Sequence, residues 1–254
     1  MGKLQTLDEY LAENEFLRET AEFHLRLEKI LSNVQSLDLP AREKVLELVN
    51  ADKIPLLQRD DFRKNFLDAV NETLTKKFPE QKISPELAEK LLQQDNHAVN
   101  EICASSELNE TLTRKIFWAT VDKLVPENLK RLERDDWSEN FCPICGRRPV
   151  MAQLKKFNEG RARYLSCGAC GTLWHWRRTS CPYCGCDDLE KIHIFEFDGK
   201  LTIRLDVCDE CGAYLKTYGE EDAENIYLRD WATLHLDLLA EEKNLRKCGA
   251  VELE

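Results

Sequence analysis

Cysteine is the residue type in this sequence whose number and spacing could do chemistry. Eight of the 11 cysteines form four Cys-x-x-Cys pairs, and a glycine directly follows each pair. In such a turn the two sulfurs point toward one spot, and the glycine takes the left-handed conformation that closes the turn. Two turns together supply four thiolates, which suit a tetrahedral zinc or iron ion.

The four pairs form a duplicated array. Cys142 and Cys181, which begin the first and third pairs, are 39 residues apart, and Cys167 and Cys208, which begin the second and fourth, are 41 apart. The first and third pairs also share a Cys-Pro-x-Cys-Gly pattern that the other two lack. The repeat therefore predicts two successive rubredoxin-like modules of the zinc-ribbon type.

The duplication also predicts which cysteines share an ion. We expect two metal ions in four-cysteine sites, the first held by Cys142, Cys145, Cys167 and Cys170 and the second by Cys181, Cys184, Cys208 and Cys211. Spacing alone leaves open an interleaved arrangement in which the first and third pairs share an ion. Iron and zinc both suit four thiolates, so the sequence does not choose between them.

Each module carries hairpin signals that would position its cysteine pairs. In the first module an Asn-containing turn at 157–160 precedes a run at 161–166, and in the second the runs 192–197 and 201–207 flank an Asp-Gly-Lys turn. A module of about 40 residues is too small to fold on an apolar core alone, so metal binding should supply folding free energy.

The chain before the first pair is predicted to be helical. Apolar residues recur at helical spacing over 7–35, and shorter helices are expected near 41–50, 60–78, 85–94, 107–123 and 127–134. Ser84 and Pro85 are typical of a helix start. We predict a multidomain α+β protein with a helical domain at 1–137, metal modules at 138–178 and 179–218, and a C-terminal helix and tail at 219–254.

Composition restricts the classes of function. The net charge of −11, from 36 basic and 47 acidic residues, opposes general nucleic-acid binding. No run of 18 apolar residues is present, so we expect no membrane insertion. Without a visible export signal, clustered cysteines indicate metal ligands in a cytoplasmic protein rather than disulfides. No role is assigned to Cys103, Cys186 or Cys248, although Cys186 lies two residues beyond a predicted ligand.

One aromatic and basic stretch could contact another protein. Trp174 and Trp176 alternate along a predicted short strand, and Arg177 and Arg178 follow. In a module this small, tryptophans more often belong to the core. If they are instead exposed beside the two arginines, the four side chains would form a contact surface. Arg147 and its neighbour after the first pair could offset thiolate charge or lie in a solvated turn.

These motifs resemble the family of the formate dehydrogenase accessory (formation) protein FdhE. The resemblance covers about residues 137–240. It rests on the Cys-Pro-x-Cys-Gly-x-x-Pro run at 142–149, Leu-x-Cys-x-x-Cys-x-x-x-Trp at 165–174, Trp-x-Arg-x-x-Cys-Pro-x-Cys-Gly at 176–185, Cys-x-x-Cys-x-x-Tyr-Leu-Lys at 208–216 and Asp-Trp-Ala-Thr-Leu-His-Leu-Asp at 230–237.

The resemblance implies a cytoplasmic, metal-binding accessory protein, a chaperone that contacts the catalytic subunit of formate dehydrogenase and serves its maturation or activation. It implies iron in rubredoxin-type sites and no enzyme activity, since a site of four thiolates has no open position for hydrolysis and allows at most one-electron redox at iron. The alternative is a zinc-ribbon nucleic-acid-binding or regulatory protein, supported only by the basic stretch 147–178. The oligomeric state, a homodimer included, is left open.

Overall fold

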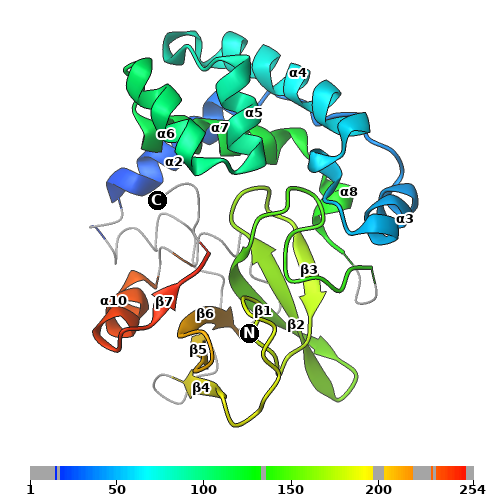
Figure 1. The fold of residues 1–254 in the computed structure, drawn as a ribbon, viewed down its shortest axis with the longest axis vertical. Helices are drawn as coiled ribbons and strands as arrows, with labels where there is room; N and C mark the ends of the chain where they lie inside the picture. The colour runs from blue at the N-terminus through cyan, green and yellow to red at the C-terminus, as the bar shows by residue number, and fades with distance from the viewer. Residues whose placement is uncertain are drawn as a thin grey trace.

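The computed structural model describes residue 15 and residues 18–132, 136–196, 203–219, 230 and 233–249. Its helices before residue 131 form one layer and its strands form a second, with the last helix beside the sheet (Figure 1). This arrangement confirms the predicted fold class of a helical region followed by a sheet region with two cysteine clusters and a C-terminal helix. The three boundaries between the four predicted domains remain a prediction.

The helical layer contains most of the predicted helices. Its elements are α2 (Arg18–Leu31), α3 (Arg42–Asp52), η2 (Leu56–Gln58), α4 (Asp60–Lys77), η3 (Pro79–Gln81), α5 (Pro85–Gln93), α6 (Asn96–Ser105), α7 (Glu110–Leu124) and α8 (Glu127–Lys130). The predicted segment 7–35 is seen as α2, and most of its earlier part lies outside the described residues. The Ser84 hydroxyl caps α5 by accepting from Leu87 N–H at 3.1 Å.

Helix α6 was not predicted. It has only ten residues, and only Val99 and Cys103 are buried, so its apolar pattern extends over little more than two turns. The signal that could have found it is the N-cap, since the Asp95 carboxylate accepts from Ala98 N–H at 3.2 Å. The buried Cys103 therefore packs inside the helical layer, away from both cysteine clusters.

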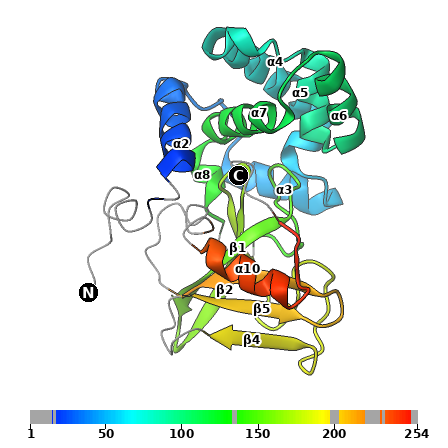
Figure 2. The same ribbon diagram turned by 90° about the vertical axis from the view of Figure 1, so that its left-hand side faces the viewer.

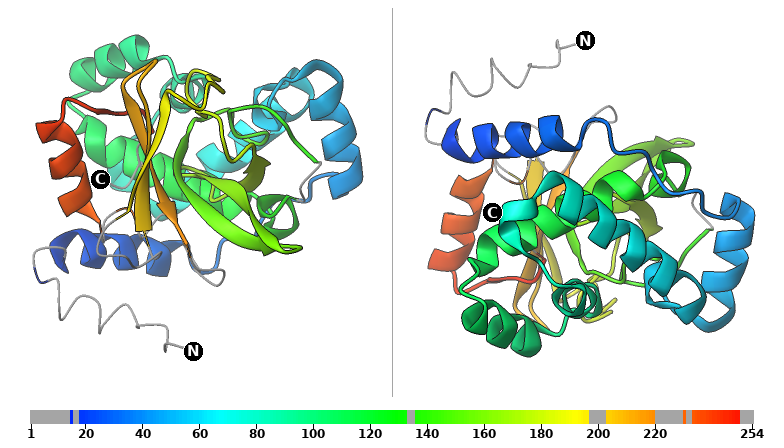
Figure 3. Two further views of the ribbon diagram at one scale, coloured as in Figure 1. Left: turned by 90° about the horizontal axis from the view of Figure 1, so that it is seen from below. Right: turned by 90° about the horizontal axis from the view of Figure 1, so that it is seen from above.

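Helix α7 lies between the outer helices and the sheet (Figures 2 and 3). It buries residues on more than one side, among them Phe117, Trp118 and Val121, each at most 1% exposed. One continuous core joins these side chains to Ile144 and Trp174 of the sheet region. The two layers are thus one packed unit rather than two independent bodies.

The sheet joins the two modules edge to edge. The first contributes β1 (Pro149–Phe157), β2 (Gly160–Cys167) and β3 (Leu173–Trp176), and the second contributes β4 (Ile192–Glu196), β5 (Ile203–Cys208) and β6 (Ala213–Tyr218). The strand order is β3-β2-β1-β6-β5-β4. Within each module neighbouring strands are antiparallel, and the modules meet where β1 pairs β6 in parallel, from Met151 opposite Lys216 to Gln153 opposite Tyr218.

Two arginines at equivalent positions of the repeat lie at this junction. They are Arg163 and Arg204, each four residues before the third cysteine of its module. Asp206 on β5 receives a hydrogen bond from Arg163 Nη1 at 3.1 Å and an ion pair from Arg204 Nε at 2.8 Å. Thr217 Oγ1 also donates to Asp206 at 2.8 Å. All four side chains are buried, and burial lowers the pKa of Arg163 while Asp206 opposes that shift. The repeat thus places a shared charge cluster between the modules.

The C-terminal segment covers the second module. Helix α10 (Leu234–Glu242) packs Leu236 and Ala240 against Leu205, Val207 and Tyr214 of the sheet, and β7 (Arg246–Lys247) adds in parallel to β6. Figure 2 shows α10 lying across the sheet. The earlier part of the predicted helix, which carries Ile226 and Trp231, lies outside the described residues.

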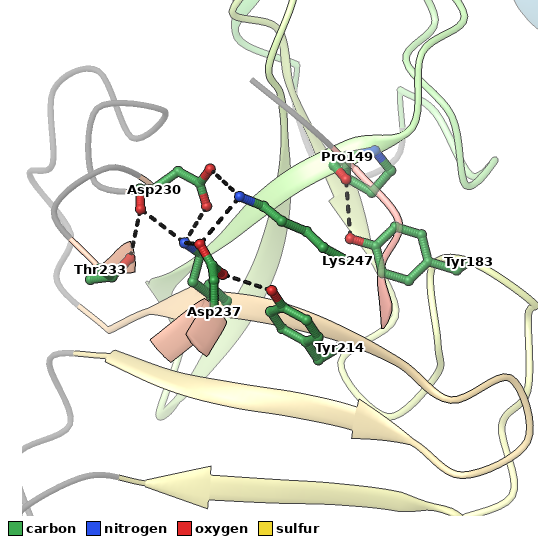
Figure 4. A network of polar contacts seen from close by, with 8 residues as sticks. Pro149, Tyr183, Tyr214, Asp230, Thr233, Asp237 and Lys247 are labelled. Carbon is green, nitrogen blue, oxygen red and sulfur yellow. Dashed lines mark hydrogen bonds and ion pairs between the residues drawn. The ribbon is translucent and has the colours of Figure 1, made fainter. Parts of the chain in front are cut away.

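A buried ion cluster fixes this segment (Figure 4). Lys216 Nζ lies 2.5 Å from Asp230 Oδ1 and 2.8 Å from Asp237 Oδ2. Lys247 Nζ pairs with the same two aspartates at 2.9 and 3.3 Å, and Tyr214 donates to Asp237 at 2.7 Å. Two lysines therefore balance two aspartates between the sheet and α10. In the described part of the chain no helix has the length and apolar character to cross a membrane.

Candidate metal centres

The first cluster joins the two cysteine pairs of the first module. Cys142, Cys145, Cys167 and Cys170 bring their Sγ atoms within 4.8 Å of one another, and each residue is 0% exposed. The close contacts run between the pairs, at 3.5 Å from Cys142 to Cys170 and 3.4 Å from Cys145 to Cys167.

The second cluster repeats this arrangement. Cys181, Cys184, Cys208 and Cys211 also lie within 4.8 Å of one another, with 3.7 Å from Cys181 to Cys211 and from Cys184 to Cys208. These contacts join the equivalent positions of the two halves. The structure thus groups the cysteines by module, as predicted, and not in the interleaved arrangement.

Both clusters fit a tetrahedral ion. A metal–sulfur bond of about 2.3 Å gives roughly 3.8 Å between the sulfurs of a tetrahedron, close to the observed separations. A disulfide requires about 2.05 Å between its sulfurs. The sulfur set therefore has the size of a metal cage, and iron and zinc both suit it.

The turns that present the sulfurs are built from backbone hydrogen bonds. Gly146 N–H donates to the Cys142 carbonyl at 2.8 Å, and Gly185 N–H donates to the Cys181 carbonyl at 3.0 Å. Their φ angles of +80° and +79° lie in the left-handed region that glycine adopts without strain. In the second module Tyr183 N–H also points at Cys181 Sγ, at 3.4 Å.

The helical layer closes over the first centre. Leu56 and Leu57 N–H of η2 donate to the carbonyls of Pro143 and Ile144 at 2.8 and 2.9 Å. On the other side the Gly171 turn lies against α7, where an added Cβ would come 3.0 Å from Asp122 Oδ1. The first cluster is thus held between two parts of the helical layer.

Arg147 lies beside the first centre rather than in a solvated turn. Its guanidinium is 4.9 Å from the centroid of the Trp118 ring, and burial lowers its pKa while the nearby cysteines, Cys145 first, oppose that shift. A positive charge there would offset the negative charge of four thiolates around a divalent ion. The neighbouring Arg148 is exposed.

When no ion is bound, burial opposes ionisation of several of the clustered thiols. It raises the pKa values of Cys142, Cys145 and Cys181, and it raises that of Cys208 to about 11. Burial also opposes ionisation of Cys167, but hydrogen bonds with the other three thiols of its cluster outweigh it and lower the pKa. Since the ligands are thiolates, an ion that binds displaces protons from most of these groups.

The structure separates the four residues of the predicted contact surface. Trp174 and Trp176 are 0% and 7% exposed, and their indole N–H groups donate to the carbonyls of Glu139 and Ser180 at 3.1 and 3.4 Å. Both are core residues, while Arg177 and Arg178 are exposed. A contact role for this stretch therefore depends on the two arginines and stays a prediction.

The glycines that close the first and third cysteine turns allow a matched prediction. Gly146→Ala and Gly185→Ala should each lose about 1–2 kcal/mol because alanine is strained at these φ angles. Gly146→Ala should lose a further ~1 kcal/mol, since its Cβ would lie 3.0 Å from the Pro55 ring and would displace the end of the Gln58 side chain, 2.5 Å away, whereas a Cβ added at Gly185 has no described atom within 4 Å. Denaturant unfolding of both variants measures the difference. Equal losses would contradict the packing of η2 on the first turn.

Comparisons with known proteins agree with these features. Residues 141–178 match the model of the central domain of FdhE. An FdhE homolog of Shewanella sp. (strain MR-4) is 33% identical over 138 residues, which is 53% of this chain and 43% of the relative. Protein FdhE of Escherichia coli O9:H4 (strain HS) is 32% identical over 133 residues, 50% of this chain and 41% of the relative. The matched stretch is thus less than half of each curated relative.

The fold is shared more widely than the sequence. The crystal structure of the FdhE protein from Pseudomonas aeruginosa matches with a TM-score of 0.63 and covers 94% of this chain and 88% of that one, at 20% identity. At that identity the likeness concerns the fold alone. The central-domain match and the curated relatives, over the stretch that they share with this chain, indicate similarity to the FdhE family, and the fold is the one seen in an FdhE protein.

Proposed function

We propose that this chain is a cytoplasmic, metal-binding accessory protein for formate dehydrogenase, and that it contacts the catalytic subunit of that enzyme during maturation. The two four-cysteine clusters of matching geometry carry the proposal, because the first of them lies in the stretch 141–178 that matches the central domain of FdhE. The eight clustered cysteines would hold two ions, iron or zinc. Clustered reduced thiols are typical of a cytoplasmic protein.

The surroundings of the clusters favour a binding role over turnover of a substrate. An ion held by four thiolates offers no open coordination position for a reacting molecule. The cavity beside the first cluster, between Trp118 and Ala169, measures about 30 Å³, and the one beside Cys181 and Cys208 about 10 Å³. Substrate pockets usually measure about 300–1,000 Å³. A larger hollow of about 420 Å³, beside Phe62 of α4, contains no cysteine or histidine.

Co-purification with the catalytic subunit of formate dehydrogenase tests the proposal. The wild-type chain should retain the subunit, and Cys181→Ala/Cys184→Ala, which removes two predicted ligands, should retain less and support less enzyme activity. Metal analysis of both proteins shows whether the second ion has been lost. Unchanged capture together with full formate dehydrogenase activity in the variant would reject a role for the second centre.

Charge reversal tests the exposed arginines directly. Arg177→Glu/Arg178→Glu should weaken capture about tenfold and make it less sensitive to salt, because exposed charges at an interface act mainly by steering association. Lys44→Glu/Lys64→Glu is the matched control, since these lysines are exposed on the helical layer. Equal binding by both variants, measured as a Kd at two salt concentrations, would remove the arginines from the contact surface.

A further inference from the structure

The two centres differ in how far solvent reaches them. All four cysteines of the first centre are 0% exposed. In the second centre Cys181 and Cys208 are 4% and 2% exposed, whereas Cys211 is partly exposed and Cys184 is exposed. The sequence repeat predicts two equivalent sets of ligands, but in the fold the second set is more exposed to solvent than the first.

The helical layer explains this difference. Carbonyls of the first turn accept from Leu56 and Leu57, and the second turn packs against Asp122, so both turns of the first centre are covered. The equivalent turns of the second centre end in Gly185 and Gly212, which have no described atom within 4 Å of an added Cβ. These turns present one face of the second centre to solvent.

Exposure of a ligand sulfur matters for ligand exchange. An incoming thiolate or chelator must approach the ion, and the leaving cysteine must be accommodated as a polar group. At the first centre the leaving sulfur would stay in an enclosed and largely apolar setting, which carries a desolvation cost. At the second centre Cys184 can turn toward water.

Two further cysteines belong to segments that bond to the turns of the second centre. Cys186 is partly exposed, and its carbonyl accepts from Cys181 N–H at 2.8 Å, so the residue belongs to the third turn. Cys248 is also partly exposed and directly follows β7, whose Arg246 N–H donates to the carbonyl of Gly212 in the fourth turn at 2.7 Å. Besides its four predicted ligands, the second centre thus has two more cysteines, Cys186 and Cys248, in or next to segments that bond to its turns.

We propose that the second centre is the exchangeable one, whose ion enters and leaves through the face formed by Cys184 and Cys211, while the ion of the first centre is a permanent structural part. The proposal rests on the proposed function in that both centres hold an ion. The exchanging ion would be a thiophilic divalent ion presented by an external thiol. In the exchange step the external thiol forms a metal–sulfur bond and gives its proton to the departing Cys184 thiolate, with no change in oxidation state.

Release of zinc from the zinc-loaded full chain tests this assignment. An excess of a strong chelator is added with N-ethylmaleimide, released zinc is followed over time, and alkylated cysteines are located by peptide mass spectrometry. One zinc per chain should leave at least about tenfold faster than the other, because thiol exchange rates depend on access. Alkylation of Cys181, Cys184, Cys208 and Cys211 should accompany this fast phase. Equal rates, or earlier alkylation of the first centre, would overturn the proposal.

Two variants sharpen the result. Cys184→Ser should remove the fast phase and leave the slow zinc in place. Cys186→Ser/Cys248→Ser keeps all eight predicted ligands and should retain the fast phase, and its loss there would contradict entry at Cys184. The wild-type alkylation map gives the answer even where a variant fails to fold. Two release rates without capture of formate dehydrogenase would reject only the proposed function, and capture with equal rates would reject only the exchangeable centre.

Discussion

Replacing Cys167 by serine should remove one metal ion and destabilise the whole protein by several kcal/mol. Cys167 is 0% exposed and belongs to the first centre. Structural zinc contributes about 10–16 kcal/mol of apparent binding free energy in small metal-folded peptides, which is as large as the whole stability of a typical domain, roughly 5–15 kcal/mol. Loss of this ion would also leave the sulfurs of Cys142, Cys145 and Cys170 buried without the metal that they would share.

The damage should spread beyond the sheet region. One core connects Trp118 of α7 with Ile144 and Trp174, and η2 donates directly to the first turn. Thermal unfolding followed by helical circular dichroism, together with metal analysis, measures both effects. Cys186→Ser is the control, because it makes the same chemical change on a partly exposed residue outside the predicted cage and should stay within about 0.5 kcal/mol. A Cys167→Ser protein with two ions and unchanged helix stability would refute the structural role of the first centre.

Lys216→Met should cost about 3–5 kcal/mol, the usual result of removing one partner of a buried ion pair. Lys216 is 1% exposed and lies against Asp230, which is 0% exposed, so the substitution leaves a buried carboxylate with one lysine fewer. Lys247→Met is the matched control, since its side chain is 24% exposed and water can replace part of its interaction. Chemical denaturation of the two variants gives the difference.

A second substitution separates charge from packing in this cluster. Lys216→Met/Asp237→Leu restores the balance of one lysine and one aspartate, so it should recover part of the stability lost by Lys216→Met. A cost below about 1 kcal/mol for Lys216→Met alone would contradict a cluster that fixes the C-terminal segment to the sheet.

The metal cages were predictable because their information is local. A Cys-x-x-Cys-Gly turn presents both sulfurs by itself, and the repeat of about 40 residues indicates which turns belong together. The strand that carries Trp174 was predictable for the same reason, since its alternation matches its burial pattern. The helical layer followed from apolar spacing, and α6 was missed because it is short and buries only Val99 and Cys103.

What the sequence did not predict depends on contacts between distant segments. The parallel pairing of β1 with β6, which makes one sheet of the two modules, involves Met151 and Lys216, and no turn motif links them. The ion cluster needs α10 to dock before Asp237 can meet Lys216. The unequal exposure of the two centres likewise depends on where η2 and α7 lie over the first module.

The most direct test of the two four-sulfur cages is a metal and thiol count on anaerobically purified protein. Elemental analysis gives the ions per chain, and alkylation before and after reduction under denaturing conditions gives the state of the eight clustered cysteines. We predict two ions per chain with all eight sulfurs reduced. Fewer than two ions, or a native disulfide between any of those cysteines, would contradict the account.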